Sequence, residues 1–265
     1  METVKILEDI KNLKNNKIIG KPKINNSNII FKGYNNILFC EDNLELNNST
    51  ISFEGNNSII YLSFGKYPIT LIVRHNSTVF IGKDNKIISK VIINVQENQN
   101  FIMGDDGIIG SGVNIRLSDI FPIYNSKTKN RINFTKSVFI GDHVWLDFLS
   151  YLSGGVQIGS GAIIGNHAYI PPYSKIPSNS YVLGNPGKII NKNIFFTKEN
   201  TSNYTPSETN NSSTYKSDVF IYKTNEETLD LNKINMILNQ LSSEDTLEFI
   251  TKLFVKNKRK NRFSI

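Results

Sequence analysis

Residues 118–136, SDIFPIYNSKTKNRINFTK, combine an acid with aromatic side chains in a way that could support proton transfer. A carboxylate or an imidazole beside a hydroxyl group can accept its proton and act as a general base. In an extended segment, residues two apart share a side, so we expect Asp119 to lie on the side of Phe121. Asp119 is therefore our candidate for the base. The alternative is that it only caps the loop.

The chain has three histidines, the side chains best suited to proton transfer near neutral pH. His143 and His167 each follow a repeated aliphatic position by three residues. That spacing predicts a corner of the chain and favours a structural or solvent-facing role over a catalytic one. His75 falls in an expected inward slot, so we predict a core residue. His143 is the first alternative base and a candidate for substrate contact.

Trp145 is the only tryptophan of the chain. Its place in the repeat described next predicts a side chain that points outward beside a groove. There its indole N–H could donate to an oxygen that gains negative charge during a reaction. A place in the core is the alternative.

Aliphatic residues recur at every sixth position in the second half of the chain, at Ile140, Leu146, Leu152, Ile158, Ile164, Ile170, Ile176 and Val182. A small or β-branched residue follows each of them after four positions, up to Pro186. A period of six fits neither an α-helix, at about 3.6 residues per turn, nor a lone strand. It predicts an all-β solenoid in which each unit is a short strand and a corner, with the aliphatic residues stacked inward.

A longer repeat extends the solenoid toward the N-terminus. Residues 25–39 match residues 47–61 at an offset of 22, as in Asn25/Asn47, Ile29/Ile51, Phe31/Phe53 and Ile37/Ile59. This offset indicates one rung of three units with a longer corner. We predict a β-helix domain over residues 21–195, interrupted by the loop 118–136, and an N-terminal cap over residues 1–20 that covers the open strand edge.

The last part of the chain is predicted to be a linker followed by helices. Residues 196–218 are polar and rich in Ser, Thr and Asn, which is typical of a linker. Residues 229–241 and 242–256 carry apolar residues at helical spacing, and Ser242 is followed by acids, as at many helix starts. We expect a helical hairpin and a basic tail over residues 219–265, packed on the solenoid or on a neighbouring subunit.

Composition limits the location and the partners of the protein. The single cysteine, Cys40, excludes an intrachain disulfide and indicates a reducing compartment. The first residues lack the apolar stretch of a signal peptide, and no apolar run reaches the roughly 18 residues of a membrane span. We predict a cytoplasmic protein without a metal site.

The net charge of +7 is concentrated in the tail KNKRKNRFSI. This tail predicts either peripheral contact with an anionic polymer or with the inner face of the membrane, or a solvated extension behind a helix. No recognition module for nucleic acid accompanies the charge, so nucleic acid is not an expected partner.

The repeat and the loop together resemble a known family. FIGDHVWLDFLSYLSGGVQIGSGAIIG followed by LGNPGKII is similar to the hexapeptide-repeat acyltransferases, and SDIFPIYNSKTKNRIN resembles their S-D-x-H-P-I-Y-D…R-I-N loop. The nearest members are O-acetyltransferases of bacterial capsule and lipopolysaccharide sugars, including polysialic acid O-acetyltransferases. The resemblance covers residues 50–195 and implies a left-handed parallel β-helix, here with a C-terminal helical appendage.

The resemblance also implies a reaction. In this family a sugar hydroxyl attacks acetyl-CoA directly, a loop histidine acts as general base, and the enzyme is a homotrimer with CoA between subunits. The resemblance implies that the glycan acceptor contacts Phe121, Tyr124 and His143, and that Trp145 borders the acceptor. At the donor site Asn166 touches the pantetheine amide through its backbone, Phe148 fills part of the pantetheine channel, and Lys175 and Lys188 lie near the CoA phosphates.

The sequence departs from the family pattern at the chemical centre. Phe121 replaces the loop histidine and Asn125 an aspartate, while Asp147 and Phe148 stand where glycine and a small or polar residue are common. Phenylalanine cannot accept a proton, and loss of a general base costs about 10²–10⁴-fold in rate.

Two functions therefore remain open. The first is an acetyl-CoA-dependent O-acetyltransferase acting on a bacterial surface polysaccharide, a capsule or lipooligosaccharide sugar such as sialic acid. The second is a non-catalytic relative that keeps the β-helix scaffold and binds CoA or glycan. Activity with acetyl-CoA and a capsular oligosaccharide would discriminate between them. A nucleotide-sugar N-acetyltransferase is disfavoured because the chain lacks the α/β domain that precedes the β-helix in several such relatives.

Overall fold

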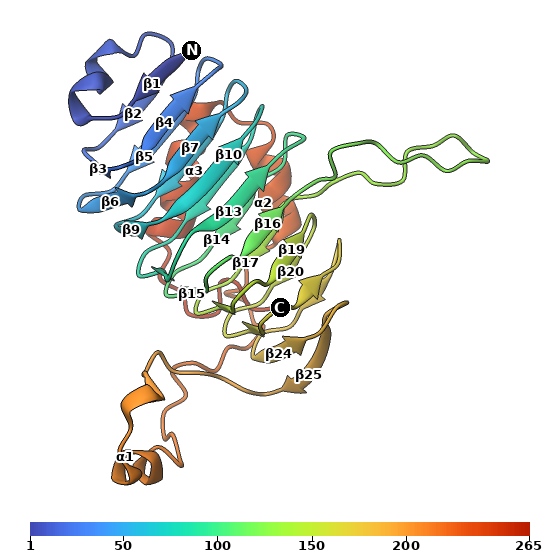
Figure 1. The fold of residues 1–265 in the computed structure, drawn as a ribbon. Coiled ribbons are helices and arrows are strands. Elements are labelled where there is room, and N and C mark those ends of the chain that lie inside the picture. Colours follow the sequence, from blue (N-terminus) through green and yellow to red (C-terminus); the bar gives the residue numbers. More distant parts are fainter.

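The computed structural model describes all 265 residues and shows a three-sided parallel β-helix with helices along one side (Figure 1). Consecutive strands pass from one side to the next, so neighbours within a sheet come from successive rungs. The all-β solenoid predicted from the six-residue repeat is thus confirmed, including its left-handed β-helix class and its C-terminal helical appendage.

Sheet 1 consists of β1 (Glu2–Val4), β4 (Asn28–Phe31), β7 (Thr50–Phe53), β10 (Ile69–Val73), β13 (Val91–Val95), β16 (Asn114–Arg116), β19 (Tyr151–Ser153) and β22 (Tyr169–Ile170). Sheet 2 consists of β2 (Lys17–Ile19), β5 (Ile37–Cys40), β8 (Ile59–Leu62), β11 (Thr78–Ile81), β14 (Phe101–Met103), β17 (Val138–Ile140), β20 (Gln157–Ile158) and β23 (Lys175–Ile176).

Sheet 3 consists of β12 (Lys86–Ile87), β15 (Ile108–Ile109), β18 (Trp145–Leu146), β21 (Ile163–Ile164), β24 (Ser180–Leu183) and β25 (Lys188–Lys192). A separate sheet of β3 (Lys23–Asn25), β6 (Leu44–Asn47) and β9 (Gly65–Tyr67) forms the same side in the first rungs. All pairs are parallel except β1 with β4 and β24 with β25, one at each end of the solenoid.

The N-terminal end of the solenoid is covered by the chain itself. Strand β2 already pairs with β5, so the coil begins before residue 21. Strand β1 pairs antiparallel with β4, and the short 3₁₀ helix η1 (Leu7–Asn12) follows it. These segments occupy an edge that would otherwise be open to another strand.

The inward side chains form one continuous core. Ile140, Leu146, Ile158, Ile164 and Ile170 are buried, as the six-residue spacing predicts. They belong to a cluster of 39 buried residues that runs the length of the solenoid. Because each buried aliphatic side chain contributes about 1.5–3 kcal/mol relative to an exposed one, this stack is the main source of stability.

The corners explain why the chain is so rich in asparagine. Residues Asn26, Asn35, Asn48, Asn57 and Asn76 all have positive φ angles, which asparagine tolerates better than most residues. Their side chains also bond from rung to rung, with 2.9 Å from Asn35 Nδ2 to Asn57 Oδ1 and 3.1 Å from Asn76 Nδ2 to Asn98 Oδ1. The predicted offset of 22 is the register of these rungs, since Asn25 pairs with Asn47 and Phe31 with Phe53.

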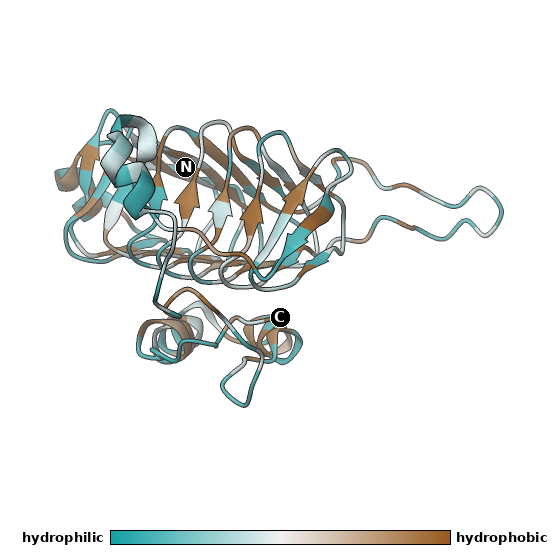
Figure 2. Cartoon of the chain, turned by 90° about the horizontal axis from the view of Figure 1, so that it is seen from below, coloured by the Kyte–Doolittle hydropathy of each residue, from teal (hydrophilic) through white to brown (hydrophobic).

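Two helices cover the outer face of sheet 2 (Figure 2). They are α2 (Leu231–Leu238) and α3 (Ser243–Ile250), and α3 continues as a π-helical turn, η3 (Thr251–Val255). Ser242 accepts a hydrogen bond from the Asp245 N–H, so the predicted helix cap is present. Buried apolar residues on the helices pack on Ile59, Phe80 and other outward residues of the sheet. None of the helices has the length and apolar character needed to cross a membrane.

The segment between the solenoid and these helices is not a featureless linker. It contains η2 (Thr201–Asn203) and α1 (Pro206–Asn211), which Thr205 begins with a capping box. Figure 1 shows this arm extending away from the body of the molecule. The first residue of the predicted linker, Phe196, is buried against the solenoid.

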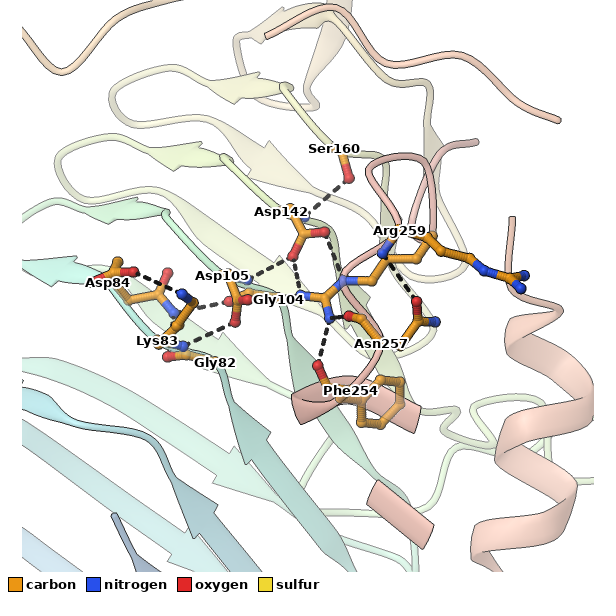
Figure 3. A network of polar contacts seen from close by, with 12 residues as sticks. Gly82, Lys83, Asp84, Gly104, Asp105, Asp142, Ser160, Phe254, Asn257 and Arg259 are labelled. Atoms are coloured by element: carbon orange, nitrogen blue, oxygen red, sulfur yellow. Dashed lines mark hydrogen bonds and ion pairs between the residues drawn. The ribbon is translucent and has the colours of Figure 1, made fainter. Parts of the chain in front are cut away.

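The basic tail is also not fully solvated. Arg262 and Phe263 are buried, and the Arg262 guanidinium bonds to Asp142 at 2.7 and 2.9 Å and to Asp105 at 3.0 Å. Figure 3 shows Asp105 and Asp142 next to each other in this network. Asp105 and Asp142 lie at the corners that follow β14 and β17. Burial raises the pKa of the Asp105 carboxyl, with attraction to Arg262 opposing and repulsion from Asp142 adding to the shift. The ion pairs fasten the end of the chain to the solenoid.

Candidate functional site

The loop 118–136 leaves the solenoid after β16 and returns at β17, and it projects from the corner between sheets 1 and 2 (Figure 1). Its two arms run antiparallel, with a bridge between Tyr124 and Arg131 and a 2.9 Å bond from the Ile132 N–H to the Ile123 carbonyl. Arg131 anchors the stem by a 2.6 Å ion pair with Glu97. The insertion is therefore an ordered hairpin, and Tyr124 is exposed on it.

Asn125 makes the turn at the tip of this hairpin. Its side-chain oxygen accepts hydrogen bonds from the backbone N–H groups of Lys127 and Thr128, both at 2.9 Å. An aspartate carboxylate can accept the same two bonds. The departure from the family pattern at Asn125 thus preserves the turn.

Asn133 organises the base of the loop. Its amide nitrogen donates to the Asp119 carboxylate at 2.9 Å and to the Phe121 carbonyl at 3.0 Å, and its side-chain oxygen accepts from the Ile123 N–H at 2.8 Å. The Phe121 side chain is 75% exposed. Asp119 is thus held in place and accessible.

A pocket of about 280 Å³ lies between the loop base and the outer face of sheet 1. Its lining includes Asp119 as the only acidic residue and Arg116 as the only basic one, together with Tyr151, Tyr169 and Tyr173. The sequence analysis did not identify Arg116 or these tyrosines. The signal was present, because Tyr151 and Tyr169 pair in register one rung apart on the outer face of sheet 1.

Trp145 lies on another side of the solenoid. In β18 the Leu146 side chain is buried in the core, so Trp145 points outward from sheet 3, half-buried between Ile108 and Ile163. The Phe196 ring packs 5.7 Å from the indole. A single chain therefore does not bring Trp145 together with Asp119.

His143 does not occupy an open site. It is fully buried, and its ring is stacked between two phenylalanine rings. The ring centroids lie 4.2 Å apart for Phe196 and 4.1 Å apart for Phe220. Its Nδ1 lies 2.7 Å from an Asp106 carboxylate oxygen, and its Nε2 lies 2.9 Å from the Phe196 carbonyl. The expectation of a substrate contact is corrected here, because residues after the solenoid cover this corner and leave no surface for a ligand to reach.

Asp106, which pairs with this buried histidine, is itself partly exposed to solvent. Its other carboxylate oxygen pairs with Lys198 at 2.5 Å. Burial by itself would raise the pKa of Asp106, but the hydrogen bonds with His143 and Lys198 outweigh it and lower the pKa below the usual value. The group fastens the segment after the solenoid to the corner that follows β14.

The other two histidines are both exposed at corners. The prediction that His75 is a core residue is wrong. It lies in the turn after β10, where its Nδ1 accepts the Asn56 N–H at 3.2 Å, because the longer rungs of this region move it past the inward position. His167 lies at the corner after β21, with the Phe148 ring edge-on at 5.6 Å.

The residues assigned to the acyl donor are spread over the last rungs. Phe148 is 45% exposed, and Asn166 is exposed at the next corner on the same edge. Lys175 is exposed on sheet 2 and Lys188 on sheet 3, and neither forms an ion pair. Asp147 accepts the Phe148 N–H at 2.8 Å, which accounts for an acid at this corner.

Comparison with known proteins agrees with this architecture. Residues 137–172 match the family model described as bacterial transferase hexapeptide (six repeats). A polysialic acid O-acetyltransferase of Escherichia coli O1:K1 / APEC is 29% identical over 128 residues, which are 48% of this chain and 41% of that protein. One of Neisseria meningitidis is 41% identical over 54 residues, 20% of this chain and 25% of that protein. The chain thus matches less than half the length of each of these relatives.

Two solved structures share the fold. The polysialic acid O-acetyltransferase OatWY has a TM-score of 0.62 at 23% identity, covering 76% of this chain and 97% of that chain. The polySia-specific acetyltransferase NeuO has a TM-score of 0.56 at 24% identity, covering 75% and 97%. The resemblance to hexapeptide-repeat proteins of this kind is therefore confirmed.

Proposed function

We propose that the chain is an acetyl-CoA-dependent O-acetyltransferase acting on a bacterial surface polysaccharide, a capsule or lipooligosaccharide sugar such as sialic acid. The observation that carries this proposal is the pocket at the base of the loop. It holds one accessible carboxylate, Asp119, fixed by Asn133. It lies in a chain whose sequence is similar to two polysialic acid O-acetyltransferases.

The proposed reaction is direct acyl transfer. Asp119 accepts the proton of a sugar hydroxyl as its oxygen attacks the thioester carbonyl carbon of acetyl-CoA. The new C–O bond forms, the C–S bond breaks, and the proton passes from Asp119 to the departing thiolate. The Trp145 indole N–H, supplied by a neighbouring subunit, would stabilise the negative charge on the carbonyl oxygen.

The residues assigned to the acyl donor, which lie on sheets 2 and 3 and at the corners after sheet 3, have the chemical properties needed to bind CoA. Trp145 and Phe148 offer apolar surface for the pantetheine arm, and Asn166 offers a backbone amide. Lys175 and Lys188 are free cations for the phosphates. Acetyl-CoA supplies the activated acetyl group, and these residues would hold and orient it.

We infer that the loop contacts a second copy of the chain. Its exposed apolar residues are Ile120, Phe121, Ile123, Ile132 and Phe134. Exposure of these apolar side chains to water is unfavourable, and large exposed apolar patches mark interaction surfaces. We infer a homotrimer in which the loop of one subunit lies beside Trp145 of the next, and a protein that works in the cytoplasm, where it meets its donor.

One observation favours a second function. Phe121 stands where relatives of this type carry a loop histidine, and no imidazole lines the pocket. The alternative is a non-catalytic protein that keeps the scaffold and binds CoA or glycan. Purified protein incubated with acetyl-CoA and a sialic acid oligomer separates the two, since only an enzyme releases CoA thiol in proportion to the acceptor added. Binding of both ligands without thiol release would support the alternative.

A further inference from the structure

Arg116 is the one half-buried arginine of the chain without a partner. Its Nε atom is buried and makes no hydrogen bond, and none of the ion pairs of the chain includes Arg116. The other arginines that are partly or fully buried all have partners, in the pairs Arg74–Asn94, Arg131–Glu97 and Arg262–Asp142. A buried polar group without a partner is unfavourable, so an unpaired guanidinium in a pocket points to a ligand.

The fold places Arg116 in this position. It is the last residue of β16, where it pairs in register with Asn94 of β13 and Ser153 of β19. The Asn94 side-chain oxygen is already occupied by Arg74 and Gln96, at 2.9 and 2.8 Å. Arg116 lines the pocket at the loop base, and its buried Nε makes no hydrogen bond to either neighbouring rung.

The composition of the pocket selects the kind of anion. A guanidinium binds a carboxylate or a phosphate through paired N–H donors. Asp119 lines the same pocket, and its negative charge would repel a dianionic phosphate more than a single carboxylate. Asp119 instead favours a hydroxyl group, and Tyr151, Tyr169 and Tyr173 offer flat apolar faces with polar tips. An acidic sugar has all three matching features, because it carries a carboxylate, hydroxyl groups and a ring of limited polarity.

We propose that Arg116 binds the carboxylate of an acidic sugar unit of the acceptor, and that this pocket is the acceptor subsite. The inference rests on the proposed function in one respect, because it identifies the glycan that the same site would acetylate. It makes Arg116 a specificity-determining residue, which selects acidic over neutral sugars and directs a hydroxyl group toward Asp119.

Calorimetry with a sialic acid oligomer and with its carboxyl-reduced counterpart tests the proposal on the full chain. We expect the acidic oligomer to bind about 10- to 100-fold more weakly to Arg116→Met, in line with the loss of a charge-assisted pair. The matched control Arg259→Met removes an equal charge at an exposed position outside the pocket and should bind as wild type does. Since Arg116→Met keeps the apolar stem and removes an unpaired buried group, its melting temperature should be unchanged or raised, whereas a structural arginine would lower it.

Three results would overturn the proposal. They are equal binding of the acidic oligomer by Arg116→Met and wild type, equal binding of the acidic and carboxyl-reduced oligomers by wild type, and absence of binding at millimolar oligomer. Displacement of the oligomer by CoA in wild type but not in Arg116→Met would assign the pocket to a donor phosphate instead. Binding that depends on Arg116 without any acetyl transfer would uphold this inference and contradict the proposed enzyme activity.

Discussion

At the scale of single residues, the base of the loop is an ordered frame around position 121. Asn133 ties the Asp119 carboxylate to the Phe121 backbone, and Asn125 makes the turn at the tip. The side chain at position 121 itself is apolar and exposed. The frame therefore lacks an imidazole and keeps Asp119 as its candidate base.

Replacing Phe121 by histidine tests the alternative of a non-catalytic protein. If wild type is inert, the added imidazole should raise acetyl transfer by about 10²-fold or more, because a general base contributes factors of this size. If Asp119 is already the base, Phe121→His should change the rate much less. CoA affinity should stay the same in either case, as calorimetry can check. Thiol release measured against Phe121→Leu, a variant that removes the ring and adds no base, gives the comparison, and an inert wild type with equally inert histidine and leucine variants would show that the loop cannot support proton transfer.

Asp106 predicts a pH dependence of stability. Its pKa is lowered in the folded protein, so its contribution is present above the pKa of the unfolded chain and is lost as pH falls through the lower, folded value. Since its side chain is 42% exposed, solvent screening limits the effect to about 1 kcal/mol or less. Urea titrations at pH 7 to pH 3 should show that the free energy of unfolding falls less on acidification in Asp106→Asn than in wild type. An identical pH profile in both proteins would refute this role.

At the scale of elements, the solenoid was predictable because each rung carries its own signal. The six-residue spacing and the offset of 22 are local patterns, and both reappear as strand register. The burial of His143 and Arg262 was not predictable. Their partners Phe196, Phe220 and Asp142 lie between 53 and 120 residues away, and one member of each pair stands in a segment that carries no repeat. The prediction for His75 was wrong for a related reason. It counted positions in sixes, and that spacing does not hold where a rung has 22 residues.

The tail that contains Arg262 should fasten the helical appendage to the solenoid. Arg262→Met leaves Asp105 and Asp142 without a countercharge in a buried setting, a change that typically costs about 3–5 kcal/mol. Urea unfolding should show this loss, with earlier release of the helices by hydrogen exchange. Arg259→Met, at an exposed position three residues earlier, should stay within about 0.5 kcal/mol of wild type. Equal stability of the two variants would contradict the proposed fastening.

At the scale of the whole molecule, two segments are anchored at their bases and project away from a compact solenoid. They are the loop 118–136 and the arm that carries α1 (Figure 1). Sheet 2 is covered by helices, whereas sheets 1 and 3 keep exposed outward residues such as Ile92 and half-buried ones such as Trp145. The open sides and the projecting loop are what an assembly of several copies would use.

We therefore expect a stable homotrimer in sedimentation velocity at micromolar concentration. Shortening the loop by removal of residues 123–132 should weaken the assembly, because it deletes part of the exposed apolar surface and leaves the solenoid core intact. The shortened chain should keep the strand content of wild type in circular dichroism. A wild-type protein that sediments as a monomer would remove the shared site, since one chain keeps Asp119 apart from Trp145.

The central claim is that Asp119 is the general base of an acetyl transfer to a glycan. The most direct measurement is the acetyl ester content of a sialic acid oligomer after incubation with acetyl-CoA, determined by mass spectrometry for wild type and Asp119→Asn. We predict ester formation by wild type, and a loss of about 10²-fold or more in Asp119→Asn with unchanged CoA binding. Equal ester formation by both proteins would contradict the role of Asp119, and its absence from wild type despite CoA binding would contradict the enzyme itself.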